Sequence, residues 1–113
     1  MQPNIKICYL YRDGSNYKRF GAVVLANPLN ATLDDIYASF GIAFRTLQLH
    51  PDVIHFQPAL LGWDDLFFPD HNPEGPDDLD LHEFEDIAST DETPNMTQTV
   101  DDLATRLAEL APR

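Results

Sequence analysis

The chain has 113 residues, of which 43% are hydrophobic and 11% aromatic, so it carries enough apolar side chains for one hydrophobic core. Nineteen acidic residues against seven basic ones give a formal net charge of −12, which repels nucleic acid and anionic membranes. Direct binding of DNA or RNA is therefore disfavoured. No apolar run approaches the roughly 18 residues that a transmembrane helix requires.

The N-terminal sequence and the cysteine content both favour the cytoplasm. The chain begins MQPNIK, which lacks the basic-then-apolar order of a signal peptide. The single cysteine, Cys8, has no second cysteine with which to form an internal disulfide. It lies in an apolar run, which predicts a buried and inert thiol instead of a nucleophile. We therefore expect a reduced, cytoplasmic protein.

The first part of the chain predicts a β-hairpin. Residues 5–12 alternate two sets of side chains and are rich in β-formers, as expected for a strand covered on at least one face. Residues 13–16 read Asp-Gly-Ser-Asn, in which glycine and asparagine tolerate the positive φ of tight turns. Residues 17–26 are again strand-like, so the two runs should pair.

A helix over residues 33–47 is predicted to lie across this hairpin. Thr32 is placed as its N-cap, with Asp35 at the third helical position in a capping-box-like arrangement. One apolar face follows from helical spacing of Leu33, Ile36, Tyr37, Phe40, Phe44 and Leu47. Gly41 costs about 1 kcal/mol against alanine inside a helix, which indicates close packing at that position.

The remainder predicts short strands and a second helix. Residues 53–56 and 66–68 are expected as strands, residues 70–80 as a polar loop, and residues 82–87 as a strand with Phe84 and Ile87 inward. Thr99 should cap a helix whose apolar face comprises Val100, Leu103, Leu107 and Leu110. The order β-β-α-β-β-α predicts a single α+β domain over residues 1–113, with an antiparallel sheet of about four strands and two helices.

Three segments carry a resemblance. YLYRDGSNYK (9–18), FGAVVLANP (20–28) and HEFEDIASTDETP (82–94) resemble a group of small, acidic, uncharacterised bacterial proteins. The likeness covers roughly positions 5–95 and is most specific in the hairpin and in HEFE. It implies a bacterial, cytoplasmic origin, and the group has no activity to carry over.

The excess negative charge is confined to residues 64–92. This stretch contains twelve acidic residues and no lysine or arginine, whereas the other seven acids are matched by all seven bases. Apolar residues recur among the acids, so the segment should be bound to the core and its carboxylates held in place. The partner-binding residues predicted here are Asp64, Asp65, Asp70, Glu74, Asp77, Asp78, Asp80, Glu83, Glu85 and Asp86, together with Trp63.

Fixed carboxylates on a small scaffold favour a non-catalytic protein that occupies a basic surface of a partner protein. In size and charge the chain resembles phage inhibitors of CRISPR or restriction complexes, which mimic the charge of nucleic acid. One alternative is an antitoxin, immunity or general interaction module with an apolar hot spot around Trp63. A further alternative is that the acidic segment has no binding role and only keeps the protein soluble.

A small metal-dependent enzyme is the second alternative. Residues 70–78 match five positions of a calcium-binding EF-hand loop, but Leu81 stands where a bidentate glutamate is needed. A solvated acidic loop is favoured there over a weak cation site. His71 and His82 lack metal-ligand spacing, and contact of His82 and Glu83 with Tyr9 or Tyr11 does not follow from sequence. No catalytic residue, metal ligand or cofactor is therefore assigned.

Overall fold

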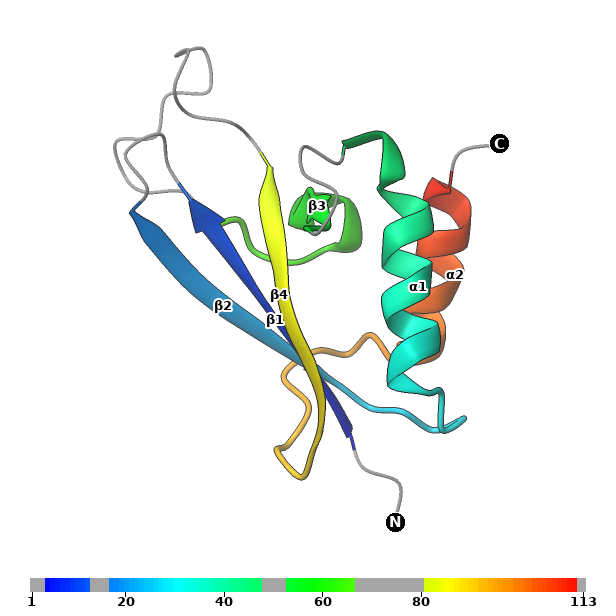
Figure 1. Ribbon diagram of the computed structural model, residues 1–113. Coiled ribbons are helices and arrows are strands. Elements are labelled where there is room, and N and C mark those ends of the chain that lie inside the picture. The colour runs from blue at the N-terminus through cyan, green and yellow to red at the C-terminus, as the bar shows by residue number, and fades with distance from the viewer. Residues whose placement is uncertain (1–3, 13–16, 48–52, 67–80, 112–113) are drawn as a thin grey trace.

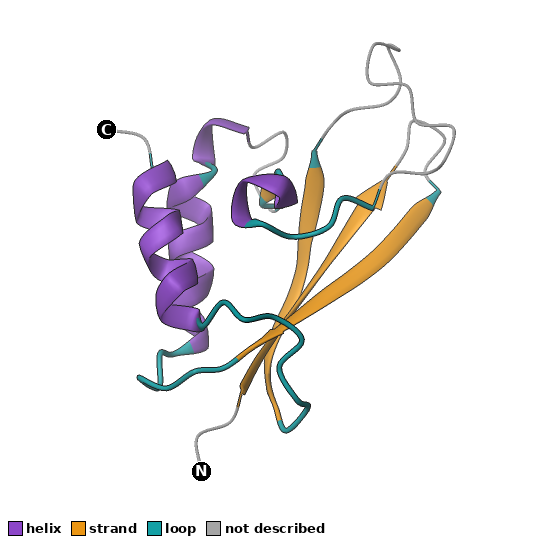
Figure 2. Ribbon diagram, turned by 180° about the vertical axis from the view of Figure 1, so that it is seen from behind, coloured by secondary structure: helices purple, strands orange, loops and turns teal. Residues whose placement is uncertain are grey.

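The computed structural model describes residues 4–12, 17–47, 53–66 and 81–111. Both helices and the intervening short segments lie on one face of a strongly curled sheet, and no helix of the described residues lies on the opposite face (Figures 1 and 2). In chain order the elements are β1 (Asn4–Arg12), β2 (Lys18–Leu25), α1 (Leu33–Ala43), the 3₁₀ turn η1 (Arg45–Leu47), β3 (His55–Phe56), the 3₁₀ turn η2 (Pro58–Leu61), β4 (His82–Thr90) and α2 (Val100–Leu110). The predicted α+β class is confirmed.

The four strands form one antiparallel sheet in the order β2-β1-β4-β3. The β1–β2 hairpin is confirmed, while its predicted turn at residues 13–16 lies outside the described residues. Side chains of β1 alternate between the helix-covered inner face, which receives Ile7 and Tyr9, and the open outer face, which receives Lys6 and Cys8.

A β-bulge in β4 explains how its side chains are distributed. Phe84 pairs with Tyr9 and Ile87 pairs with Ile7, although three positions separate them on β4 and only two on β1. The extra residue is Glu85, which falls where the register shifts between Cys8 and Tyr9. The bulge lets both Phe84 and Ile87 point inward, as the sequence predicted.

Both helices begin at the predicted threonines. The Thr32 hydroxyl accepts a hydrogen bond of 3.1 Å from the Asp35 N–H. Thr99 forms a complete capping box, since its hydroxyl accepts from the Asp102 N–H and the Asp102 carboxylate accepts from the Thr99 N–H. The two helices lie side by side and start at the same end (Figure 1). A hydrogen bond from Val100 N–H to the Ala26 carbonyl joins α2 to the end of β2.

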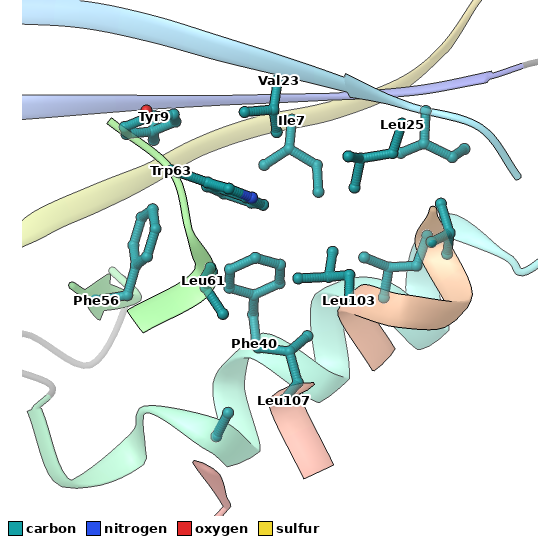
Figure 3. Packing of buried hydrophobic residues seen from close by; sticks show 14 of the residues in the cluster. Ile7, Tyr9, Val23, Leu25, Phe40, Phe56, Leu61, Trp63, Leu103 and Leu107 are labelled. Atoms are coloured by element: carbon teal, nitrogen blue, oxygen red, sulfur yellow. The ribbon is translucent and has the colours of Figure 1, made fainter. Parts of the chain in front are cut away.

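The core lies between the sheet and the helix pair and is unusually aromatic at one end. Tyr9 from β1, Phe40 from α1, Phe56 from β3 and Trp63 meet there, with ring centroids between 5.6 and 5.9 Å apart in the contacting pairs (Figure 3). At the other end, aliphatic side chains from the hairpin pack on α2 through Leu103 and Leu107. Edge-to-face aromatic contacts of this kind add to the stabilisation from buried area.

Three predictions about the middle of the chain need correction. Helix α1 ends at Ala43 and not at residue 47, because the Phe44 N–H closes the last turn and a 3₁₀ turn follows. Leu66 is not in a strand, and the rest of the predicted strand, residues 67–68, lies outside the described residues. A Cβ at Gly41 would meet only Ile54, at 3.9 Å, so no close packing explains that glycine.

Candidate functional site: the acidic segment

Seven of the twelve acids between residues 64 and 92 fall in the described part of the chain. Five acids that were predicted as partner-binding residues lie outside it: Asp70, Glu74, Asp77, Asp78 and Asp80. Residues 70–78, which partly match an EF-hand loop, lie outside it as well. The described acids are Asp64, Asp65, Glu83, Glu85, Asp86, Asp91 and Glu92. The geometry of the site is therefore built from these seven.

Asp64 and Asp65 lie on a strap, residues 63–66, that crosses the inner face of the sheet. The Tyr9 hydroxyl donates a hydrogen bond of 2.7 Å to the Asp64 carbonyl, and the Leu66 N–H donates one of 2.9 Å to Nε2 of His82. Beyond β1, the Leu66 side chain lies over Gly21 of β2. Contacts to three strands thus fix the strap, while the two aspartates remain exposed.

The strap also anchors through Trp63, whose ring is buried in the core with 4% of its surface exposed. Its indole N–H donates to Oε1 of Gln98, and Nε2 of Gln98 donates in turn to the Leu61 carbonyl. A buried ring whose polar atom is already bonded is part of the core. The predicted apolar hot spot at Trp63 is therefore wrong, because a partner cannot reach this side chain.

The acids of β4 differ in how far their charge is neutralised. Glu83 forms an ion pair with Arg12, with Nε 2.8 Å from Oε2 and a second nitrogen 3.4 Å from Oε1. Glu85, at the bulge, and Asp86 are exposed and form no ion pair with any described residue. Of the predicted binding residues on β4, Glu85 and Asp86 thus present uncompensated charge, whereas Glu83 is committed to a structural pair.

Beyond β4, Glu92 is paired with Lys6 at 2.9 Å. A hydrogen bond and charge attraction raise the pKa of Lys6 and lower that of Glu92. Because both side chains are solvated, salt screens this pair and it contributes little stability. Asp91 stays exposed between β4 and this pair. Within the described segment, five exposed carboxylates form no ion pair with a described basic residue: Asp64, Asp65, Glu85, Asp86 and Asp91.

Four of these carboxylates form two pairs on opposite faces of the sheet, Asp64 with Asp65 and Glu85 with Asp86. Burial, together with the charges of Asp64 and Asp65, raises the pKa of Tyr9 to about 12, and Tyr9 points to the inner face. Burial raises the pKa of the Cys8 thiol on the outer face; Lys6 opposes this, and Glu85 and Asp86 add to it. The described acids thus do not form one continuous row.

The burial and the pKa of Cys8 also bear on the reactivity of its thiol. Its side chain is half-buried on the outer face and not fully buried as predicted, because neither α1 nor α2 covers that face. A thiol whose pKa is raised carries little thiolate at neutral pH and reacts slowly. The prediction of an unreactive thiol agrees with this direction of the pKa.

His82 does meet two tyrosines, but in a core and not in a cleft. Its ring lies 6.0 Å from that of Tyr9 and 5.2 Å from that of Tyr11, and its side chain is fully buried. Nε2 accepts the Leu66 N–H, whereas Glu83 turns to the outer face toward Arg12. Neighbouring side chains of a strand point to opposite faces of the sheet, so His82 and Glu83 cannot act together on one tyrosine. His82 instead has a structural role, as the hydrogen-bond acceptor for the Leu66 N–H.

Two hollows among the described residues lie along α1 and α2, and none of the five exposed carboxylates of the acidic segment lines them. The larger, about 280 Å³, runs along the seam of α1 and α2, and apolar side chains and one hydroxyl line it: Ser39, Ile42, Ala104, Leu107, Ala108 and Ala111. No titratable side chain lines it. Among the described residues no three histidine, cysteine or acidic side chains gather as metal ligands would. No helix in the described part of the chain is long and apolar enough to cross a membrane.

Comparisons with known proteins add no homologue. No family model, curated protein or solved structure matches this chain. Function must therefore be argued from the arrangement of its own residues.

Proposed function

We propose that this protein is a non-catalytic, acidic protein-binding module that occupies a basic surface of a partner protein in the cytoplasm. The observation that carries the proposal is that exposed carboxylates sit on rigid supports. Glu85 and Asp86 project from a strand that pairs with β1 on both sides of the bulge, and Asp64 and Asp65 project from a strap held by Tyr9. Fixed charges lose little conformational entropy on binding, unlike those of a disordered acidic tail.

The distribution of charge favours a basic protein over the other classes of partner. The net charge of −12 repels nucleic acid and anionic lipid, and it speeds association with a positively charged surface. A nucleic-acid-binding protein supplies such a surface, so an inhibitor that mimics nucleic-acid charge, as in anti-CRISPR or anti-restriction proteins, is the specific form we favour. An interface centred on Trp63 is not proposed, since that ring is buried.

The proposal is tested with a partner isolated by cross-linking in a bacterial lysate and then purified. Affinity should fall steeply between about 0.05 and about 0.5 M salt, and DNA should compete for the same surface. Two charge-neutralised variants, Asp64→Asn with Asp65→Asn and Glu85→Gln with Asp86→Asn, should bind more weakly. The matched control, Asp34→Asn with Asp35→Asn on α1, removes the same charge elsewhere and should bind almost normally.

An affinity insensitive to salt and equal for all three double variants would contradict the proposal. Such a result would favour an apolar interface, or a segment whose charge serves solubility alone. Circular dichroism of each variant checks that the fold is retained, so that a loss of binding reports on charge.

A further inference from the structure

Strand β4 has an open edge over most of its length. On one side it pairs with β1 from Asn4 opposite Thr90 to Tyr11 opposite His82. On the other side β3 contains only two residues, which pair with Glu83 and His82, and the Phe84 N–H then donates to the Ile54 carbonyl. From Glu85 to Thr90 no described strand pairs with this side of β4.

The outward-pointing main-chain groups on this edge belong to Ile87 and Ser89. The Val24 N–H donates to the Asn95 side chain, which lies beyond the sheet, so it points away from β1. Val24 is paired with Lys6 on β1, and the two residues therefore do not bond each other. The main-chain N–H and C=O of Lys6 point toward β4 instead. Lys6 lies opposite Ala88, which makes Ala88 the residue that faces β1. Because directions alternate along a strand, Ile87 and Ser89 direct their N–H and C=O groups outward.

The opposite edge of the sheet is covered where this one is open. On β2, the Asn95 side chain accepts from the Val24 N–H, and the Asn95 N–H donates to the Val24 carbonyl. Within the described residues no such group meets the outward N–H and C=O of Ile87 or Ser89. The two edges therefore differ, and a peptide has main-chain groups to pair with on β4.

The acidic side chains near the open edge of β4 favour some strands over others as pairing partners. Glu85 and Asp86 are exposed at the start of the open stretch, and Asp91 is exposed just beyond its end. A second copy of this edge would bring the same carboxylates together, and like charges on adjacent strands are destabilising. A strand with lysine or arginine side chains would instead meet opposite charge along its length. Tyr37 of α1, whose ring touches that of Phe84 and is 47% exposed, offers an apolar contact beside the edge.

We propose that an extended basic segment of the partner adds to the edge of β4 as a fifth strand, paired through the main-chain groups of Ile87 and Ser89. This inference rests on the proposed function and names how the basic partner is held. Main-chain hydrogen bonds would supply affinity, and Glu85 and Asp86 would supply the preference for basic side chains. The two exposed acids and the bulge also keep the edge from pairing with itself.

The test uses the full chain and a short peptide that alternates lysine with valine, with a glutamate–valine peptide as the control. Nuclear magnetic resonance should show at least about tenfold slower amide exchange of Ile87 and Ser89 when the lysine peptide saturates the protein, since new hydrogen bonds protect them. The glutamate peptide should change neither amide. Absence of binding by the lysine peptide, or binding that leaves both amides unprotected, would overturn the proposal.

A pair of variants separates this proposal from the broader one. Ser89→Pro removes an outward N–H and leaves the hydrogen bonds to β1 in place, whereas Ser89→Thr keeps the N–H. If Ser89→Pro weakens peptide binding about tenfold or more and Ser89→Thr does not, strand addition is supported. If Glu85→Gln with Asp86→Asn weakens binding but Ser89→Pro does not, strand addition fails while charge-driven binding stands. If neither weakens binding, both proposals fail for this surface.

Discussion

The side chain of Leu66 occupies the space that a side chain at Gly21 would need. A Cβ built at Gly21 would lie 3.0 Å from Cδ2 and 3.1 Å from Cδ1 of Leu66, and 3.4 Å from the Tyr9 ring. The glycine therefore lets the strap that carries Asp64 and Asp65 cross the sheet closely. A residue on β2 thus determines where carboxylates more than forty positions later in the chain are placed.

Gly21→Ala is expected to destabilise the protein by about 1–3 kcal/mol, because the half-buried Leu66 side chain must shift to admit the added methyl group. Urea unfolding measures the change. The double variant with Leu66→Ala should cost less than the sum of the two single changes, since the smaller side chain removes the clash. Costs that add without coupling would show that the contact does not hold the strap.

Gly41→Ala should have the opposite effect and stabilise the protein by about 1 kcal/mol. Gly41 lies inside α1, and an added Cβ would make an ordinary contact of 3.9 Å with Ile54. Alanine gains helix propensity there and meets no steric obstacle. Thermal unfolding of this variant beside Gly21→Ala compares one substitution at two sites. A destabilised Gly41→Ala would mean that α1 packs more tightly than this distance indicates.

His82→Phe is expected to release the end of the strap, whereas His82→Gln should largely retain it. The imidazole Nε2 is the acceptor for the Leu66 N–H, and glutamine places an oxygen at a similar reach. Loss of that acceptor leaves a half-buried N–H without its hydrogen bond, at a cost of about 1–3 kcal/mol. Amide exchange at Leu66 should speed up in His82→Phe alone. Equal protection of Leu66 in both variants would contradict this role.

Local signals account for what the sequence predicted correctly. Thr32 and Thr99 mark helix starts because a cap depends on residues within one turn. The strand predicted at residues 82–87 followed from its composition, and the structure extends it to Thr90. Phe84 and Ile87 were both expected to point inward, and the bulge at Glu85 is what makes this possible. Each of these features is determined by neighbours close in sequence.

The path of the strap and the hydrogen-bond partner of Trp63 could not be predicted in the same way. Trp63 is one of the apolar residues expected to bind the acidic segment to the core, but its N–H partner Gln98 is 35 residues away. The Leu66–Gly21 contact likewise depends on which strand the chain crosses. The division of the acids between two faces follows from the register of β4 on β1, which composition does not specify.

Tyr9 should be the tyrosine whose ionisation most directly reports on the strap. Burial and the charges of Asp64 and Asp65 raise its pKa to about 12, against a usual value of 10.0. The folded state therefore holds this proton more tightly than the unfolded state does. Its contribution to stability is fully present below about pH 10 and is lost as the pH rises through about 12.

Tyr9→Phe removes both the ionisation and the hydrogen bond to the Asp64 carbonyl. At neutral pH this variant should be less stable by about 1 kcal/mol, the usual net contribution of such a bond. Between about pH 10 and about pH 12 the gap to the unaltered protein should narrow, because only the unaltered protein loses the Tyr9 contribution there. Urea unfolding across this range, with phenolate absorbance followed in parallel, measures both effects. A constant gap would show that Tyr9 ionises as readily when folded as when unfolded, so that neither burial nor the charges of Asp64 and Asp65 raise its pKa.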